Sequence, residues 1–353
     1  MPGIKAQRKR VTGNLNTAQQ WRAQLDDHVN SLVWSPDGQW LAAASVSGPI
    51  TIFDGKTGQV RHTLIGHRFG TSEIAWNDAG TLLASAGQDG KVRLWDRESG
   101  EIRQEFEGGS AWVEHLAWVP GGDLLASAAG RSLRVWNAAT SQMVQEYPPH
   151  SGTIYDVQWQ PHAPLLISAA YGGMHFWLPD STNLVRSLTW KGSILVIACS
   201  PDGRYIATGD QDSTVHFWMV QTGQDLQMYG YPTKVRELSW DGTSRYLATG
   251  GSDVVTVWDC SGKGPAGSKP IELAGHDAFI SALAFAHRGL LIATASADGR
   301  LIFWQIGKQK QPHPLVQAAF DSSISQLTWS PDDRLLALGT ESGLVTVCST
   351  PTV

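Results

Sequence analysis

Short apolar segments separated by turn residues recur along the whole chain. Between residues 66 and 96, three such segments lie at 74–76, 82–85 and 92–95, and Asn, Asp and Gly occupy turns such as 77–80. Short β-prone segments bounded by Gly, Asp and Asn are typical of an antiparallel meander. This part of the chain therefore predicts adjacent short strands rather than a helix.

The same pattern returns at a nearly constant interval. Each predicted first strand ends at an aromatic or cysteine anchor, and the spacings between successive anchors are 42, 42, 41, 40, 41, 45 and 44 residues. A segment of small residues such as Leu83-Ala84-Ser85 follows each anchor, which suits crowded inner strands. The chain of 353 residues therefore contains eight units, whose anchors are Trp34, Trp76, Trp118, Trp159, Cys199, Trp240, Phe285 and Trp329.

The second unit carries Gly-His at 66–67, Asp-Gly at 89–90 and Trp-Asp at 95–96. This combination resembles a WD40 repeat, and the spacing matches that family's period of about 40–45 residues. The resemblance covers nearly the whole chain. It implies an all-β fold, an eight-bladed WD40 β-propeller with four antiparallel strands in each blade. Seven blades are the alternative.

We predict a flexible tail at residues 1–18, a single propeller domain at 19–349 and a short tail at 350–353. The chain ends soon after the third strand of the eighth unit, so that unit lacks its outer strand. We expect the segment around Trp21, at residues 20–25, to supply the missing strand and close the ring. Closure would remove the exposed sheet edges that invite aggregation.

The resemblance also implies a buried hydrogen-bonded network within a blade, formed in the second unit by His67, Ser85, Asp89 and Trp95. Each such bond is worth about 1 kcal/mol net, whereas leaving a buried partner unpaired costs about 1–3 kcal/mol. A hydrolytic triad of Ser85, His67 and Asp89 is the alternative, but the network also explains the tryptophan and the repetition. The equivalent residues of the seventh unit are His276, Thr294, Asp298 and Trp304.

Net charge, hydropathy and cysteine content limit the classes of function that the protein can have. The net charge of −5 makes no electrostatic case for nucleic acid binding, and no apolar run approaches the ~18 residues of a membrane span. The basic residues at 5–10 precede no apolar stretch, so we expect a solvated tail there, with contact to nucleic acid or acidic lipid as the alternative. The three cysteines form no CxxC pair, which favours a reducing cytoplasm. We also expect a monomer.

Catalytic motifs are missing from the sequence. It contains no HExxH, no GxSxG and no GxxxxGK[ST], the motifs of zinc proteases, serine hydrolases and phosphate-binding loops. We therefore expect no enzymatic activity, no cofactor and no metal.

In WD40 proteins, residues beside the start of the first strand and before the Asp-Gly turn surround the central channel on the narrower face, where partner peptides commonly bind. The resemblance therefore implies a scaffold that binds a protein or peptide there. The alternative is a small-molecule or metal site in the channel, possibly enzymatic, which three or four convergent His or carboxylate side chains would favour. Aromatic residues and Arg are enriched at binding hot spots. The candidate residues are His28, Trp112, Glu114, Tyr155, Tyr171, Lys234, Arg236, Phe279 and Glu341.

Overall fold

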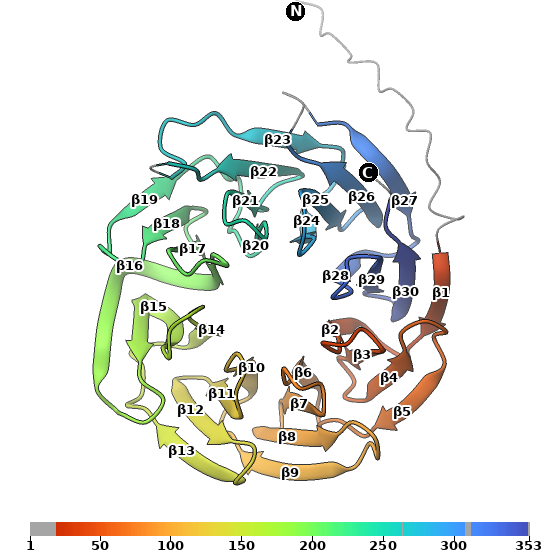
Figure 1. Ribbon diagram of the computed structural model, residues 1–353, viewed down its shortest axis with the longest axis vertical. Coiled ribbons are helices and arrows are strands. Elements are labelled where there is room, and N and C mark those ends of the chain that lie inside the picture. Colours follow the sequence, from red (N-terminus) through yellow and green to blue (C-terminus); the bar gives the residue numbers. More distant parts are fainter. Residues whose placement is uncertain (1–18, 263, 308–311, 352–353) are drawn as a thin grey trace, which may run out of the picture.

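The computed structural model describes residues 19–262, 264–307 and 312–351, which form thirty strands and no helix. The strands are arranged as a ring around a central channel (Figure 1). The all-β propeller is thus confirmed. The predicted tail at 1–18 lies outside the described residues.

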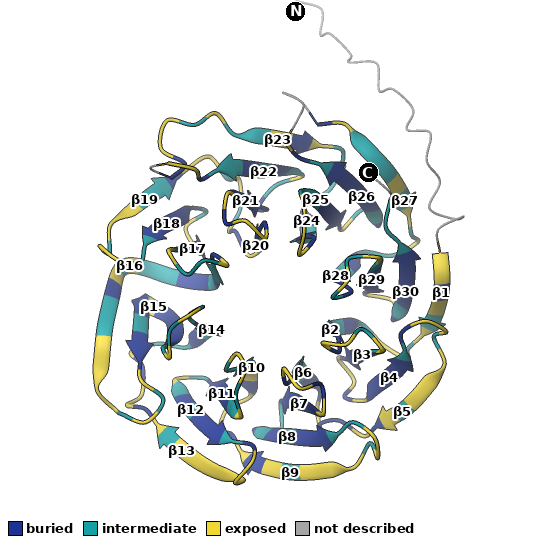
Figure 2. Ribbon diagram, in the orientation of Figure 1, coloured by how far each residue is buried: buried dark blue, intermediate teal, exposed yellow. Residues whose placement is uncertain are grey.

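The first three repeats each form one four-stranded antiparallel sheet whose strands follow one another in chain order from the channel to the rim (Figure 1). Outer strands are the most exposed, and the inner three are largely buried (Figure 2). The strands are β2 (Val29–Trp34), β3 (Trp40–Ser45), β4 (Ile50–Asp54) and β5 (Val60–Leu64); β6 (Thr71–Trp76), β7 (Leu82–Gly87), β8 (Lys91–Asp96) and β9 (Ile102–Glu107); and β10 (Val113–Trp118), β11 (Leu124–Ala129), β12 (Ser132–Asn137) and β13 (Gln142–Glu146).

The sixth and seventh repeats have the same arrangement. Their strands are β20 (Leu238–Trp240), β21 (Tyr246–Thr249), β22 (Val254–Asp259) and β23 (Ile271–Ala274), followed by β24 (Ile280–Phe285), β25 (Leu291–Ser296), β26 (Arg300–Gln305) and β27 (Pro314–Ala319).

The fourth and fifth repeats share one six-stranded sheet, which we call the double blade. Its strand β16 pairs with β15 through its first half and with β17 through its second half. When each sheet is counted as one blade, the propeller has seven blades, which was the alternative prediction. The prediction of eight separate blades is wrong because the fourth and fifth repeats share one sheet. The strands of the double blade are β14 (Ile154–Trp159), β15 (Leu166–Trp177), β16 (Leu184–Cys199), β17 (Tyr205–Asp210), β18 (Val215–Met219) and β19 (Asp225–Met228).

The fusion occurs where the chain departs from the repeat pattern. In the second repeat, Gly66 and His67 follow the end of the outer strand of the first repeat. At the place equivalent to His67 before the fifth repeat the chain has Trp190, and β16 continues from one repeat into the next. β15 does fold back on itself: the indole Nε1 of Trp177 donates to Ser168 Oγ at 2.9 Å, although nine extended residues would span about 30 Å.

The ring closes as predicted. β1 (Gln19–Gln24) pairs antiparallel with β30 (Leu344–Ser349), placing Trp21 opposite Val347. With β29 (Leu335–Thr340) and β28 (Ile324–Trp329), these strands complete the last four-stranded sheet. Trp21 also reaches the first repeat, where its Nε1 donates to the carbonyl of Gly55 at 2.9 Å. One N-terminal strand therefore ties the last sheet to the first.

Anchor tryptophans join neighbouring repeats. The indole Nε1 of Trp159 donates to the carbonyl of Ala117 in the preceding repeat at 2.9 Å, and Trp329 bonds to Ala284 in the same way at 3.0 Å. Apolar clusters likewise contain side chains from two adjacent sheets, such as Leu94 of β8 and Leu125 of β11. The core thus consists of thin layers between sheets, and it holds the first strands in fixed positions around the channel.

Candidate interaction face around the channel

A complete buried network exists in the second repeat. His67 Nδ1 lies 2.8 Å from Asp89 Oδ1, His67 Nε2 lies 2.8 Å from Ser85 Oγ, and Trp95 Nε1 donates to the same hydroxyl at 2.8 Å. Because a carboxylate only accepts, His67 carries its proton on Nδ1 and accepts from Ser85 at Nε2. All four side chains therefore have partners.

Protonation of this network follows from its surroundings. Burial lowers the pKa of His67, although the nearby Asp89 opposes the shift. Burial by itself would raise the pKa of Asp89, but the hydrogen bond from His67 and the charges of His67 and Arg93 outweigh it and hold the pKa below its usual value. The imidazole is thus neutral and the carboxylate ionised at neutral pH.

The three residues have the hydrogen-bond order of a Ser–His–Asp triad, but their position rules out nucleophilic attack in this conformation. Ser85 is 0% exposed, and its oxygen already accepts the Trp95 indole N–H. A nucleophile must reach its substrate, and a triad needs oxyanion donors beside an open site. The arrangement therefore stabilises the sheet.

Other repeats keep parts of this network. In the seventh, His276 Nε2 lies 2.8 Å from Thr294 Oγ1 and Trp304 Nε1 donates to the same oxygen at 2.9 Å, while Asp298 is 3.7 Å from the ring. In the sixth, the hydroxyl of Tyr231 stands in the place of the imidazole, 2.8 Å from Thr249 Oγ1. The sixth and seventh repeats thus retain a hydrogen bond to the threonine hydroxyl and differ in the other members of the network.

Backbone hydrogen bonds bring the two predicted sets of loop residues to one face. The turn after the second strand bonds to the loop before the first strand: Ala297 N donates to Phe279 O at 3.0 Å, and Glu341 N donates to Ser323 O at 3.0 Å. The same bond joins Val46 N to His28 O at 2.9 Å. Residues from both sets therefore surround one mouth of the channel, which we call the interaction face.

A hollow of about 640 Å³ opens at this mouth. It brings together four of the nine predicted residues, Trp112, Glu114, Tyr155 and Arg236, from the third, fourth and sixth repeats. The remaining residues that line it are Asn30, Val46, Ser72, Gln88, His115, Thr153, Asp156, Leu195 and Val196.

The other five predicted residues do not line this hollow. Tyr171 and Phe279 are 54% and 55% exposed, His28 is half-buried, and Lys234 and Glu341 are exposed. They belong to loops of the interaction face but stand away from its central hollow, so the structure does not join them into one site.

Comparisons with known proteins agree with this architecture. The family model "WD domain, G-beta repeat" matches residues 58–96, 100–137, 141–177, 182–219, 223–259 and 267–305, which is more than half of the chain. This protein belongs to the WD40 repeat family. A second model, "Anaphase-promoting complex subunit 4 WD40 domain", matches residues 8–69.

Similar proteins share only part of their length with this WD40 chain. "Protein HIR1" of Yarrowia lipolytica is 25% identical over 44% of this chain and 14% of its own length. "Periodic tryptophan protein 2 homolog" of Schizosaccharomyces pombe is 31% identical over 33% of this chain and 13% of its own length. The chain thus matches about one seventh of each relative. A solved structure, the computationally designed Ika8 protein, has a TM-score of 0.81 at 22% identity, covering 94% of this chain and 100% of Ika8, and it shows the fold alone.

Sequence reasoning missed a second row of channel residues in this WD40 protein. The pairing register shifts near the start of β10, between Val113 and His115, and the same irregularity occurs in β6 and β14. A bulge turns two consecutive side chains to the same side of a strand. Glu114 and His115 therefore both line the hollow.

This second row carries unusual titratable groups. Burial raises the pKa of Glu73 to about 8, although the backbone N–H of Leu116 donates to its carboxylate at 2.7 Å. Burial also raises the pKa of Asp156 to about 7, whereas burial and the charge of Arg236 lower the pKa of His115 to about 4. The signal that marks them in the sequence is a titratable residue three positions before an anchor.

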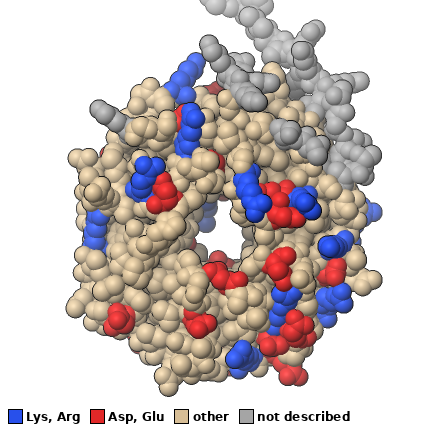
Figure 3. Space-filling view, viewed as in Figure 1, with Lys and Arg blue, Asp and Glu red and all other residues tan. Residues whose placement is uncertain are grey.

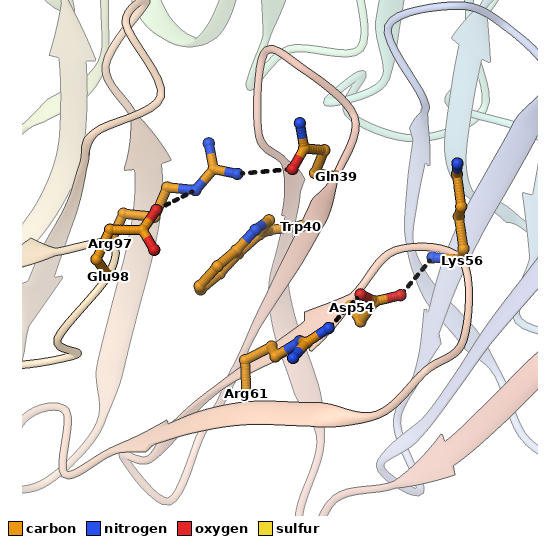
Figure 4. Close-up of a pocket in the computed structure, with 7 residues that line it drawn as sticks. All are labelled: Gln39, Trp40, Asp54, Lys56, Arg61, Arg97 and Glu98. Atoms are coloured by element: carbon orange, nitrogen blue, oxygen red, sulfur yellow. Dashed lines mark hydrogen bonds and ion pairs between the residues drawn. The ribbon is translucent and has the colours of Figure 1, made fainter.

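Charges elsewhere on the surface are mixed. Figure 3 shows the channel open at the hub, with basic and acidic side chains beside one another in small clusters on the visible face. At the outer ends of the first and second repeats, a smaller hollow of about 460 Å³ contains Trp40, with Arg61 bonded to Asp54 at 2.7 Å (Figure 4). Arg97 stacks on Trp40 at 4.8 Å and pairs with Asp37 at 2.7 Å. Because both arginines are already paired, this hollow is the weaker binding candidate.

Within the described ranges, no group of three or more His, Cys, Asp or Glu side chains is arranged to hold a metal ion. The same residues contain no helix long and apolar enough to cross a membrane. The carboxylates and the imidazole that gather at the channel mouth, those of Glu73, Glu114, Asp156 and His115, are therefore not arranged as a metal site.

Proposed function

We propose that this WD40 protein is a non-catalytic scaffold that binds a protein or peptide partner on the interaction face. One observation carries the proposal: the hollow at the channel mouth gathers Trp112, Glu114, Tyr155 and Arg236 from three different repeats. These residue types are enriched at the energetic centres of protein interfaces, with the exception of the carboxylate.

Exposure supports the same interpretation. Trp112 is 55% exposed and makes no hydrogen bond or ring contact with any described residue, although most other tryptophans of the chain are anchored within the sheets. An exposed indole at the rim of a hollow contributes nothing to the fold but provides a large area for a partner. The absence of catalytic sequence motifs and the burial of Ser85 favour a binding role over an enzymatic one.

A matched pull-down experiment tests the proposal. The full-length protein is compared with the triple variant Trp112→Ala, Tyr155→Ala and Arg236→Ala, using affinity purification and quantitative mass spectrometry. Proteins that are lost from the triple variant would support the interaction face.

A variant with Lys56→Ala and Glu98→Ala, which removes exposed charges near the Trp40 hollow, is the control and should retain every partner. Equal recovery of all partners by the triple variant would show that the interaction face is not used. Circular dichroism of both variants verifies that the fold is intact.

A further inference from the structure

The chemistry of the hollow is asymmetric. On the side of the third and fourth repeats it presents two aromatic rings, Trp112 and Tyr155, together with the carboxylates of Glu114 and Asp156. Glu73 lies beside them, its Oε2 4.0 Å from His115 Nδ1. The sixth repeat contributes Arg236, which is the single Lys or Arg among the lining residues and whose charge acts on His115.

Three of these side chains have no internal role. Trp112, Glu114 and Tyr155 make no side-chain hydrogen bond, ion pair or ring contact with any residue that the structure describes. By contrast, Glu73 accepts a backbone bond from the neighbouring repeat, and Asp156 accepts one from Ile197 at 2.8 Å. The free set is thus an indole, a phenol and a carboxylate that face the same space.

We propose that this side of the hollow binds a lysine or arginine side chain of a partner peptide, with the cation against the rings of Trp112 and Tyr155 and paired with Glu114. This inference rests on the proposed function and names the chemistry of the partner. A cation over an aromatic face is attracted by the ring's quadrupole, and more strongly when it is desolvated. A carboxylate at the same place adds a charge-assisted hydrogen bond.

Charge complementarity favours a cation over an acidic or neutral residue. Glu73, Glu114 and Asp156 stand on one side of the channel, and the nearby His115 is neutral because its pKa is lowered to about 4. An acidic side chain placed there would meet the charge of Glu114 and would oppose ionisation of Glu73 and Asp156. Arg236, which lines the same hollow, repels a second basic residue, so we expect one cation in the motif rather than a basic run.

Proton linkage provides a distinctive readout. The pKa values of Glu73 and Asp156 are raised to about 8 and about 7, so part of each is protonated at neutral pH in the free protein. The other titratable or charged groups facing them are Glu114, His115, which is neutral, and Arg236. An incoming cation stabilises the ionised carboxylates, so binding releases protons and the affinity increases with pH. An acidic peptide held by Arg236 would show the opposite dependence.

The test uses a random peptide library displayed on phage and selected on the full-length protein. Selected peptides are synthesised, and their affinities are measured by calorimetry near pH 6 and near pH 8.5. We expect peptides with a single essential Lys or Arg, whose replacement by Gln abolishes binding. Glu114→Gln should weaken binding about tenfold, and Trp112→Ala about thirtyfold or more. Affinity should be about threefold or more higher at the upper pH.

Tyr229→Ala is the matched control, because Tyr229 is an exposed aromatic residue that is neither a candidate residue of the interaction face nor part of the lining of the hollow. It should leave the affinity unchanged. Peptides that depend on Trp112 but need no Lys or Arg, or that bind Glu114→Gln equally well, would overturn the cation inference while leaving the scaffold proposal intact. If every selected peptide binds Trp112→Ala and Tyr155→Ala as tightly as the unmodified protein, or if no peptide is selected, both proposals fail.

Discussion

Closure of the ring by β1 depends on how the side chain of Trp21 packs against the first repeat. The side chain is 7% exposed, its ring centroid lies 5.3 Å from that of Phe53, and its indole donates to Gly55 O at 2.9 Å. Truncation of a buried tryptophan to alanine costs about 3–5 kcal/mol. We therefore expect Trp21→Ala to lower the free energy of unfolding by about 4 kcal/mol, including the lost hydrogen bond.

Gly58 provides the complementary perturbation. A Cβ added at this glycine would lie 2.5 Å from Cδ2 of Trp21, and its φ of +71° is left-handed. Gly58→Ala should cost about 1–2 kcal/mol for the backbone conformation and a further 1–3 kcal/mol, roughly, for displacement of the indole. In a Trp21→Ala background only the backbone cost remains.

A double-mutant cycle, measured by urea denaturation, therefore reports directly on the packing of Trp21 against Gly58. The coupling between Trp21→Ala and Gly58→Ala should be about 1–3 kcal/mol, and hydrogen exchange in β30 should accelerate in both single variants. Trp112→Ala, in the exposed position, should change stability by less than about 0.5 kcal/mol. Costs that add within about 0.5 kcal/mol would refute the packing of β1 against the first repeat.

Three further predictions concern the fold. Deletion of residues 1–25 removes β1 and exposes the edge of β30, so the melting temperature measured by calorimetry should fall markedly; an unchanged value would contradict closure. Ser85→Ala leaves the buried nitrogens of His67 and Trp95 without their shared partner and should lower the free energy of unfolding in urea by about 2–4 kcal/mol, whereas a loss below about 0.5 kcal/mol would rule out the network. Asp210 is 0% exposed, and burial raises its pKa to about 8, so the folded protein holds the proton and loses stability as pH rises from about 4 to about 8. The side chain of Asp210→Asn cannot titrate, so the variant should gain stability relative to the unmodified protein as pH rises over that range. The difference in free energy of unfolding should reach about 3 kcal/mol, half of what the full pKa shift implies. A difference in urea denaturation that does not depend on pH would contradict this.

The fold was predictable because its information is local and repeated. Apolar alternation, turn glycines and the anchor spacing lie within each repeat, so the sequence predicts the strands and even the closing strand at Trp21. The resemblance to the WD40 family implied the network around His67. The fusion of two repeats was missed because it depends on a loop that departs from the pattern at Trp190. An isolated departure carries no signal by itself of whether a strand ends or continues.

The candidate site was predictable only as a set of equivalent positions. The sequence, through its resemblance to WD40 repeats, determined which residues reach the loops of one face, because each repeat places the same position at the same end of its first strand. Only the tertiary structure decided that Trp112, Glu114, Tyr155 and Arg236 share one hollow while Phe279 stays outside it. It also added His115, through the bulge in β10, and raised the pKa of Glu73 through partial burial of its side chain beside the hollow. Distances across a ring and the loss of water inside it depend on how all the sheets pack together, and no single repeat contains that information.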